Sequence, residues 1–193
     1  MVGKSLNEID QIVHDYIIKE GGYPSALDFN NFPKSCCLSV NDVTAHGVPN
    51  SYELQEGDWL NIDVTAFKDG FHGDTSAMIM IGDVDDKIQT LSQVAREATF
   101  AAISVCKPGT KFNQLAKTVQ EYARDHGFHV CPRFGGHGIG DHLHMAPFIH
   151  YTQTRRACKE EMRPGMAFTV EPVIMMHSIS GHYYMEWRDD WTV

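Results

Sequence analysis

The sequence predicts a mixed α/β (α+β) fold in a single domain, residues 1–193, built from two similar halves. Three observations predict this class: helices with regularly spaced apolar residues, a hairpin with strict alternation, and a resemblance between the two parts of the chain. With 193 residues, 42% of them hydrophobic and 21% charged, the chain is long enough to bury one core. We place the two halves at roughly residues 1–85 and 86–193.

Three helices are predicted from apolar residues that recur at helical spacing. The first follows Ser5 and Glu8, which have the spacing of a capping box, and it ends at Gly21-Gly22. The second runs from residue 86 to 106. The third begins near residue 110 and ends at Gly127.

The first and third helices resemble each other. Placing Gly3 on Gly109 also aligns Asn7 with Asn113, Val13 with Val119, Tyr16 with Tyr122, and Gly21 with Gly127. Chance similarity is the alternative; a true duplication implies two similar halves with a site between them. The first half lacks the long helix of the second, and the second lacks the complete hairpin of the first. By this logic the chain is missing about one helix in front and one or two strands at the end.

Two carboxylates are predicted on one face of a hairpin. Residues 59–67 alternate between apolar and polar side chains, and Asp69-Gly70 is a strong two-residue turn signal. With that turn Asp63 pairs with Ser76, and Asp74 lies diagonally on the same face at roughly 7–8 Å. A one-residue bulge would move Asp74 to the other face. Because adjacent carboxylates repel unless a cation compensates them, the hairpin indicates either a divalent metal or a solvated polar face.

A second set of candidates surrounds His137 and Glu171. Four glycines accompany His137 within residues 134–140, and glycine permits unusual backbone angles and close approach of a ligand. A lone histidine is otherwise usually structural, and His142 is predicted to be an exposed bystander. Residues 166–174 predict a strand, with Glu171 in an apolar stretch where a buried carboxylate needs a partner or a metal.

Two Asp, one His and one Glu form an oxygen-rich ligand set with one imidazole. Such a set suits Mn, Fe(II), Co or Zn rather than a thiolate zinc site. Two metals about 3.5–4 Å apart would share carboxylates and activate a water between them. Four protein ligands are few for two metals, so a further carboxylate is expected.

Composition and charge argue against several other classes. The net charge of −9, without a run of Lys or Arg, is unfavourable for binding nucleic acid directly. The five cysteines contain no C-x-x-C pair, which favours reduced, buried thiols. Residues 1–15 do not read as a secretory signal, and no apolar run approaches the roughly 20 residues of a membrane span.

Six runs of residues, in this order and spacing, resemble the type I methionine aminopeptidases, a group of the M24 peptidases. The runs are Phe32-Pro33-Lys34-Ser35, His46-Gly47-Val48-Pro49, Asn61-Ile62-Asp63-Val64-Thr65, Gly70-Phe71-His72-Gly73-Asp74-Thr75-Ser76, Gly136-His137-Gly138-Ile139-Gly140 and Pro164-Gly165-Met166-Ala167-Phe168-Thr169-Val170-Glu171-Pro172. The resemblance covers essentially the whole chain. It implies the duplicated pita-bread fold, an antiparallel sheet with helices on its outer face and a metal site between the halves.

The resemblance also implies an activity and its residues. The activity would be removal of the initiator methionine from nascent proteins, by attack of a metal-activated hydroxide on the peptide bond. Two divalent ions, Co, Mn, Fe or Zn, would be held by Asp63, Asp74, His137 and Glu171. Glu171 would also be the general base, and the two substrate-contacting histidines would be His46 and His144. The methionine pocket would be lined by Cys37, Phe29 and Trp191.

The chain departs from this family at both ends. The family's second metal-binding glutamate follows the Trp-Thr-Val stretch, which here ends at Val193, and the family's first helix is absent before Ser5. We therefore expect a chain truncated at both termini. The substitutes considered for the missing ligand are Glu186, Asp189 and Asp190. Phe29 and Phe32 stand where tyrosines are common, and Ala45 stands where a cysteine is common.

Three functions are compatible with these features. The first is a methionine aminopeptidase seen as a fragment or isoform; the second is an inactive pita-bread binding module that lacks the last metal ligand. The third, a proline-specific peptidase on the same fold, is disfavoured by the segments around Cys37 and His46. The expected partners are the N-terminal Met of nascent chains and the ribosome, with no membrane, and the protein is expected to be a monomer. The cytosol is the default location, although residues 127–132 resemble the mitochondrial subtype.

Overall fold

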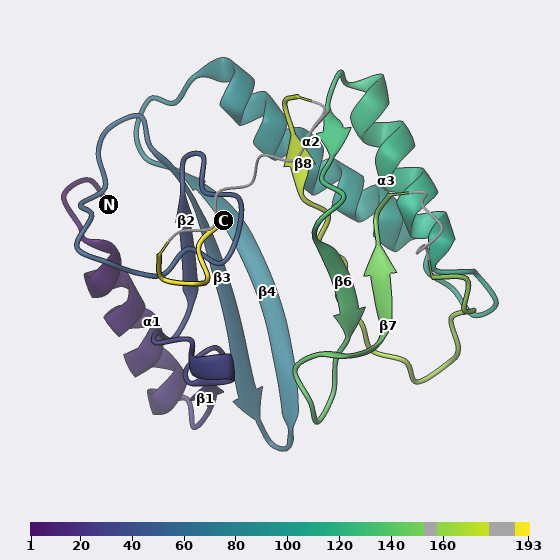
Figure 1. The fold of residues 1–193 in the computed structure, drawn as a ribbon, viewed down its shortest axis with the longest axis horizontal. Coiled ribbons are helices and arrows are strands. Elements are labelled where there is room, and N and C mark those ends of the chain that lie inside the picture. The colour runs from purple at the N-terminus through teal and green to yellow at the C-terminus, as the bar shows by residue number, and fades with distance from the viewer. Residues whose placement is uncertain (153–157, 178–187) are drawn as a thin grey trace. The chain divides into compact units, whose positions relative to one another are not determined.

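The computed structural model describes residues 1–152, 158–177 and 188–193 (Figure 1). The described residues form two compact units: residues 1–88 together with 188–193, and residues 89–177. The last six residues, however, belong to the first unit and not to the second, because Val193 exchanges backbone hydrogen bonds with the segment at Thr44 and Ala45.

Helix α1 (Leu6–Lys19) begins and ends as its sequence predicts. Ser5 and Glu8 form the capping box: the Glu8 N–H donates to the Ser5 hydroxyl at 3.2 Å, and the Ser5 N–H donates to the Glu8 carboxylate at 2.8 Å. At the other end Gly21 has a φ of 77°, which permits the Gly22 N–H to donate to the Ile17 carbonyl at 2.9 Å. This is the Schellman arrangement, in which glycine takes the left-handed position.

Replacing Ser5 with alanine is expected to lower the free energy of unfolding by about 1 kcal/mol, because one end of the capping box is lost. The Ser5 N–H and Lys4 hold the pKa of Glu8 at about 2. Since this folded-state pKa lies below the usual value of 4.5, the Glu8 contribution is complete above about pH 4.5 and is lost as the pH falls toward 2. Urea unfolding of the unsubstituted protein and of Ser5→Ala at pH 7 and pH 3 measures both effects. A smaller loss of unfolding free energy in Ser5→Ala at pH 7 than at pH 3 would contradict them.

The sheet of the first unit is organised around strand β3 (Trp59–Lys68). Strand β4 (Phe71–Met80) pairs with β3 along its whole length, and Figure 1 shows the two as a long antiparallel hairpin. Strands β1 (Tyr23–Pro24) and β2 (Cys37–Val40) also pair with β3, both antiparallel, and a short 3-10 helix, η1 (Phe29–Asn31), lies between them in sequence. The apolar face of this sheet packs against α1 in a core that contains Leu6, Ile9, Leu38 and Leu60.

The second unit packs helices α2 (Asp86–Ser104) and α3 (Asn113–Asp125) on short strands. These are β5 (His129–Val130), β6 (Gly135–Gly138), β7 (Met145–His150) and β8 (Ile174–Met175), paired antiparallel as β5 with β8 and β6 with β7. The core joins small residues of α2, such as Ala98 and Ala102, to Leu115 and Val119 of α3 and to Ile149 and Tyr151.

The two units contain matching backbone hydrogen bonds. In the first unit the Gly3 N–H donates to the Leu54 carbonyl at 2.7 Å, and in the second the Gly109 N–H donates to the Met162 carbonyl at 2.9 Å. In the same way the Ser25 N–H donates to the Thr65 carbonyl and the Cys131 N–H to the Val173 carbonyl, both at 2.8 Å. The spacing between matched donors is the same in both pairs, as is the spacing between matched acceptors. Helix α3 also ends like α1, with Gly127 at a φ of 80° and the Phe128 N–H donating to Ala123. Under this correspondence Asp63 of β3 matches Glu171.

The predicted strand over residues 166–174 is only partly formed. Phe168 makes a single bridge to Gly138, and the regular strand is limited to β8. Pro172 has no N–H to donate, and the Glu171 N–H donates to the Tyr151 hydroxyl at 2.9 Å instead of to a neighbouring strand. A side chain therefore interrupts the ladder that alternation alone would predict.

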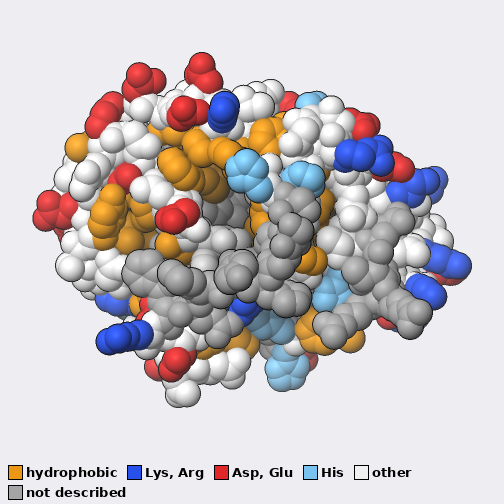
Figure 2. All heavy atoms as spheres, turned by 45° about the horizontal axis from the view of Figure 1, so that its top comes forward, with side chains coloured by type: hydrophobic (Ala, Val, Ile, Leu, Met, Phe, Trp, Pro, Cys, Tyr) orange, Lys and Arg blue, Asp and Glu red, His pale blue; other side chains and the backbone are white. Residues whose placement is uncertain are grey.

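Some hydrophobic side chains remain at the surface, as Figure 2 shows for one face of the molecule. They include Ile12, Tyr16 and Phe71. Single exposed apolar side chains are normal on folded proteins and need no functional explanation. Within the described ranges, none of the helices combines the length and the hydropathy that crossing a bilayer requires.

Candidate metal and peptide-binding site

The β3–β4 hairpin places Asp63 and Asp74 as the turn signal predicts. Asp69 and Gly70 both have positive φ, 52° and 90°, which is the geometry of a two-residue type I′ turn. Asp63 pairs with Ser76 and Asp74 pairs with Thr65. The two carboxylates are thus diagonal neighbours on the face of the sheet that points away from α1, and the bulge that would separate them does not occur.

Cys37 lies directly opposite Asp63 in the ladder between β2 and β3. Burial raises the pKa of the Cys37 thiol well above its usual range, and the negative charges of Asp63 and Asp74 raise it further. The thiol therefore stays protonated near neutral pH. A protonated, largely buried thiol is a small apolar contact surface.

An aromatic corner lies near His46 in the first unit. The Trp191 ring packs edge-on against Phe32, with ring centroids 5.2 Å apart, and against the imidazole of His46 at 6.4 Å. His46 is exposed and has a φ of 55°. Phe29, predicted for the same pocket, lies in η1 and is half-buried. Phe32 was not among the predicted pocket residues, although the Phe-Pro-Lys-Ser run that contains it was already singled out.

The segment after His46 packs tightly on β2. A methyl group at Gly47 would lie 2.2 Å from the Leu38 carbonyl oxygen. Gly47→Ala is therefore expected to lower the free energy of unfolding by roughly 1–3 kcal/mol, the usual effect of overpacking. Gly73→Ala is the control, because a methyl there meets no atom within 4 Å. Urea unfolding of both variants checks this, and equal losses would show that the Gly47 contact is not the cause.

Asp189, considered above as a substitute metal ligand, caps the end of the chain instead. Its carboxylate accepts hydrogen bonds from the Trp191 N–H at 2.9 Å, the Thr192 N–H at 2.8 Å and the Thr192 hydroxyl at 2.7 Å. Burial opposes its charge, but these bonds outweigh burial and lower the pKa of Asp189. Asp190 is exposed with a φ of 63°, and Glu186 lies outside the described residues.

His137 is buried on β6 of the second unit. It is only 6% exposed, and its Nδ1–H donates to the Gly138 carbonyl at 3.0 Å. Because Nδ1 carries the proton in this contact, the lone pair of a neutral imidazole lies on Nε2, the nitrogen through which such a histidine binds a metal. Methyl groups at Gly135, Gly136 or Gly138 would lie 2.4–2.6 Å from neighbouring backbone oxygens. The glycines around His137 thus permit close packing of β6 between its neighbours.

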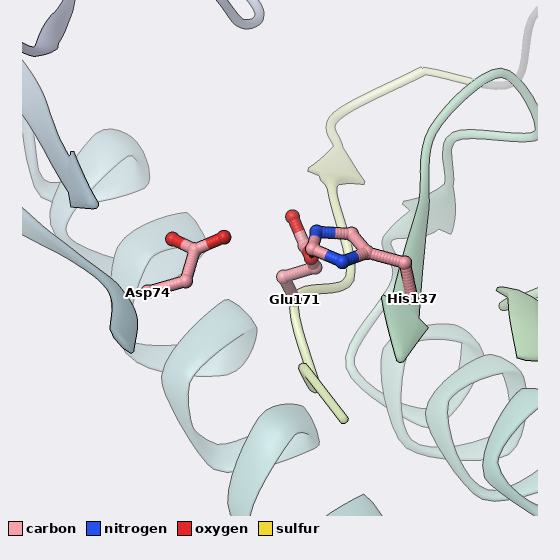
Figure 3. Close-up of side chains that lie close together, drawn as sticks. All are labelled: Asp74, His137 and Glu171. Atoms are coloured by element: carbon pink, nitrogen blue, oxygen red, sulfur yellow. The ribbon is translucent and has the colours of Figure 1, made fainter. Parts of the chain in front are cut away.

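Glu171 lies beside His137, with its Oε1 3.4 Å from Nε2 (Figure 3). Its side chain is 46% exposed, so the prediction of a buried carboxylate was wrong. The side chain leaves the apolar stretch because that stretch is not a continuous strand. Figure 3 also draws Asp74, which extends from β4 of the first unit.

Thr169 links His137 and Glu171, and the sequence did not single it out. Its hydroxyl accepts a hydrogen bond from the His137 N–H at 2.9 Å and donates to the Glu171 carboxylate. Its own N–H donates to the His137 carbonyl at 2.8 Å. One threonine therefore fixes the backbone of one candidate ligand and the carboxylate of the other.

His144 packs edge-on against His137, with ring centroids 4.2 Å apart and an interplanar angle of 84°. It is exposed, as is His142. Gly138 and Val40 occupy matching ladder positions, because Gly138 lies opposite Phe168 and Val40 lies opposite Leu60. His144 follows Gly138 by the same number of residues by which His46 follows Val40. Each unit thus presents an exposed histidine at an equivalent place.

Comparison with known proteins identifies the family. The model of metallopeptidase family M24 matches residues 1–193. Methionine aminopeptidase 2 of Mycobacterium tuberculosis is 43% identical over 192 residues, which are 99% of this chain and 66% of that protein. The mitochondrial methionine aminopeptidase 1D of Homo sapiens is 43% identical over 200 residues, which cover all of this chain and 58% of that protein. The chain thus spans about half to two thirds of the length of such relatives.

Solved structures agree with this comparison. The methionine aminopeptidase of Rickettsia prowazekii superposes with a TM-score of 0.93 at 37% identity and covers 99% of this chain, which spans 76% of that protein. Prolidase from Pyrococcus furiosus, at 20% identity and a TM-score of 0.73, shares the fold alone. The fold is the duplicated pita-bread architecture that the sequence predicted. With this fold, and with a family match from its first residue to its last, the chain belongs to metallopeptidase family M24.

Proposed function

We propose that this protein is a metal-dependent aminopeptidase that removes the N-terminal methionine from newly made polypeptides. The observation that carries the proposal is the equivalence of Asp63 and Glu171. Each lies at the same position of its unit, and each has a second side chain beside it of a type that can bind a metal, Asp74 in one unit and His137 in the other. We take the proposed reaction from the relatives of this chain that are methionine aminopeptidases.

We propose that these four residues together hold two divalent ions. The donor set fits, because three carboxylates and one imidazole suit Mn, Fe(II), Co or Zn. When bound, such ions supply Lewis acidity, which polarises a carbonyl oxygen and lowers the pKa of water. The residues of the chain supply the rest of the chemistry.

The proposed roles follow from where each side chain lies. Glu171 is half-exposed and accepts a hydrogen bond from Thr169, so it is oriented to take a proton from an attacking water. His46 and His144 are exposed imidazoles that can donate to the substrate backbone and stabilise charge that develops on the scissile amide. The protonated Cys37 thiol with Trp191 and Phe29 offers the apolar, polarizable surface that a methionine side chain favours.

Partners and location are proposed on the same basis. The N-terminal methionine of nascent chains is the proposed substrate, the ribosome is the proposed site of encounter, and the protein is proposed to act as a monomer. The relatives include bacterial, mitochondrial and chloroplastic proteins. We propose the cytosol, with the mitochondrion as the alternative that imaging of a tagged protein in its native cell decides.

The substrate class is tested by comparing two peptides, Met-Ala-Ser and Ala-Pro-Ser, with Mn(II) or Co(II) added. Release of methionine from the first, without release of alanine from the second, is the expected result. Release from the proline peptide alone would replace the proposal with a proline-specific peptidase. A folded sample that binds the metal and cleaves neither peptide would favour a binding module.

A further inference from the structure

The hydroxyl of Tyr151 lies inside the second unit, between two backbone groups of the segment that carries Glu171. Tyr151 is 1% exposed and is among the largest fully buried side chains. Its oxygen accepts a hydrogen bond from the Glu171 N–H at 2.9 Å and donates one to the Thr169 carbonyl at 3.3 Å. A tyrosine hydroxyl can donate one hydrogen bond and accept another, and here it does both.

Asp63, the residue of the first unit that matches Glu171, is held differently. Asp63 lies in a regular ladder, opposite Cys37 of β2 and Ser76 of β4. In the second unit the equivalent ladder pairs Phe168 with Gly138, and the Thr169 N–H with the His137 carbonyl; among the described residues this ladder has no further pair at Glu171. The Glu171 N–H donates to the Tyr151 hydroxyl, so a side chain binds this backbone group.

Gly136 provides the space for this hydroxyl. A methyl group at residue 136 would lie 2.6 Å from the Tyr151 oxygen and 2.6 Å from the Thr169 carbonyl oxygen. Both distances are far below van der Waals contact, so any side chain on β6 at this position would displace the tyrosine. The glycine of the Gly-His-Gly run therefore has a role apart from His137 itself.

We propose that Tyr151 is a positioning residue, whose hydroxyl fixes the backbone of Glu171 and so the direction of its carboxylate toward His137. The inference rests on the proposed function, in which Glu171 is a ligand and proton acceptor. Tyr151 acts through the Glu171 N–H and the Thr169 carbonyl. Loss of the Tyr151 hydroxyl is expected to change the orientation of the Glu171 carboxylate more than the affinity for the peptide.

The test is Tyr151→Phe, which removes the hydroxyl and keeps the ring. The first readout needs neither metal nor peptide: hydrogen exchange of the Glu171 amide, followed by NMR in the metal-free protein. Exchange is expected to accelerate at least about tenfold, while amides of α3 are unchanged. Tyr122→Phe is the matched control, because it removes a tyrosine hydroxyl that donates to Glu97 at 2.6 Å elsewhere in the same unit.

The second readout is kinetic. With metal at saturation, Tyr151→Phe is expected to lower kcat roughly tenfold and to change KM by less than about twofold, while Tyr122→Phe changes neither. Unchanged Glu171 exchange in Tyr151→Phe overturns the inference whatever the activity. If exchange is altered in Tyr151→Phe while the unsubstituted protein itself cleaves no peptide, the proposed function is refuted and the hydrogen bond is established. If Tyr151→Phe does not fold, the unsubstituted protein decides: a Glu171 amide that exchanges as fast as an exposed loop amide overturns the inference.

Discussion

Glu171→Gln is expected to reduce methionine release by about 10²–10⁴-fold, the usual contribution of a positioned general base. Glutamine has nearly the same shape and can still accept the hydrogen bond from Thr169, so the structure around it is preserved. It has neither the negative charge that a divalent ion requires nor the ability to accept a proton. Initial rates on Met-Ala-Ser at saturating peptide measure the loss.

The control for this variant is Glu121→Gln, on the exposed surface of α3. It removes the same charge from the same unit and is expected to leave the rate within about twofold, as surface substitutions usually do. If Glu171→Gln retained a rate within about threefold of the unsubstituted protein, Glu171 would have no part in proton transfer. The equivalence of Asp63 and Glu171 would then be a consequence of the fold alone.

Asp74→Asn is expected to weaken Mn(II) binding by roughly two orders of magnitude or more. Substituting a residue that merely supports a metal ligand already weakens metal affinity by about 10–100-fold. Asp74→Asn removes a proposed ligand itself, a carboxylate next to Asp63. Half of the charge compensation on that face of the hairpin is lost with it. Isothermal titration calorimetry on the metal-free protein measures the affinity directly.

Asp69→Asn is the matched control for the metal measurement. Asp69 belongs to the same hairpin but lies in its turn, where its φ of 52° is well tolerated by asparagine. The variant has the same change of charge and should keep both the fold and the affinity. Equal weakening in the two variants would mean that general charge, and not ligation by Asp74, controls binding.

The sequence predicted the parts of the structure that depend on local rules. The capping box at Ser5, the glycine that ends α1, and the register of the hairpin follow from the residues themselves. The alignment of Asp63 and Asp74 needed only alternation and the Asp69-Gly70 turn. These features need no knowledge of distant contacts, which is why they were predictable.

Contacts between distant residues were not predictable in the same way. Alternation over residues 166–174 indicated a strand, but a tyrosine 20 residues earlier accepts the hydrogen bond from the Glu171 N–H. Thr169 looked like an ordinary strand residue, although its hydroxyl connects two candidate ligands. The return of residues 188–193 to the first unit depends on the pairing of Val193 with Thr44 and Ala45, which no local pattern reveals.

The central claim is tested most directly by metal depletion and back-titration on one sample. The protein is stripped with a chelator, then titrated with Mn(II) while methionine release from Met-Ala-Ser is followed together with bound metal. We predict no release without metal, and release that returns as up to two ions bind per chain. Release that persists in the stripped protein, or two bound ions without any release, would contradict a metal-dependent aminopeptidase.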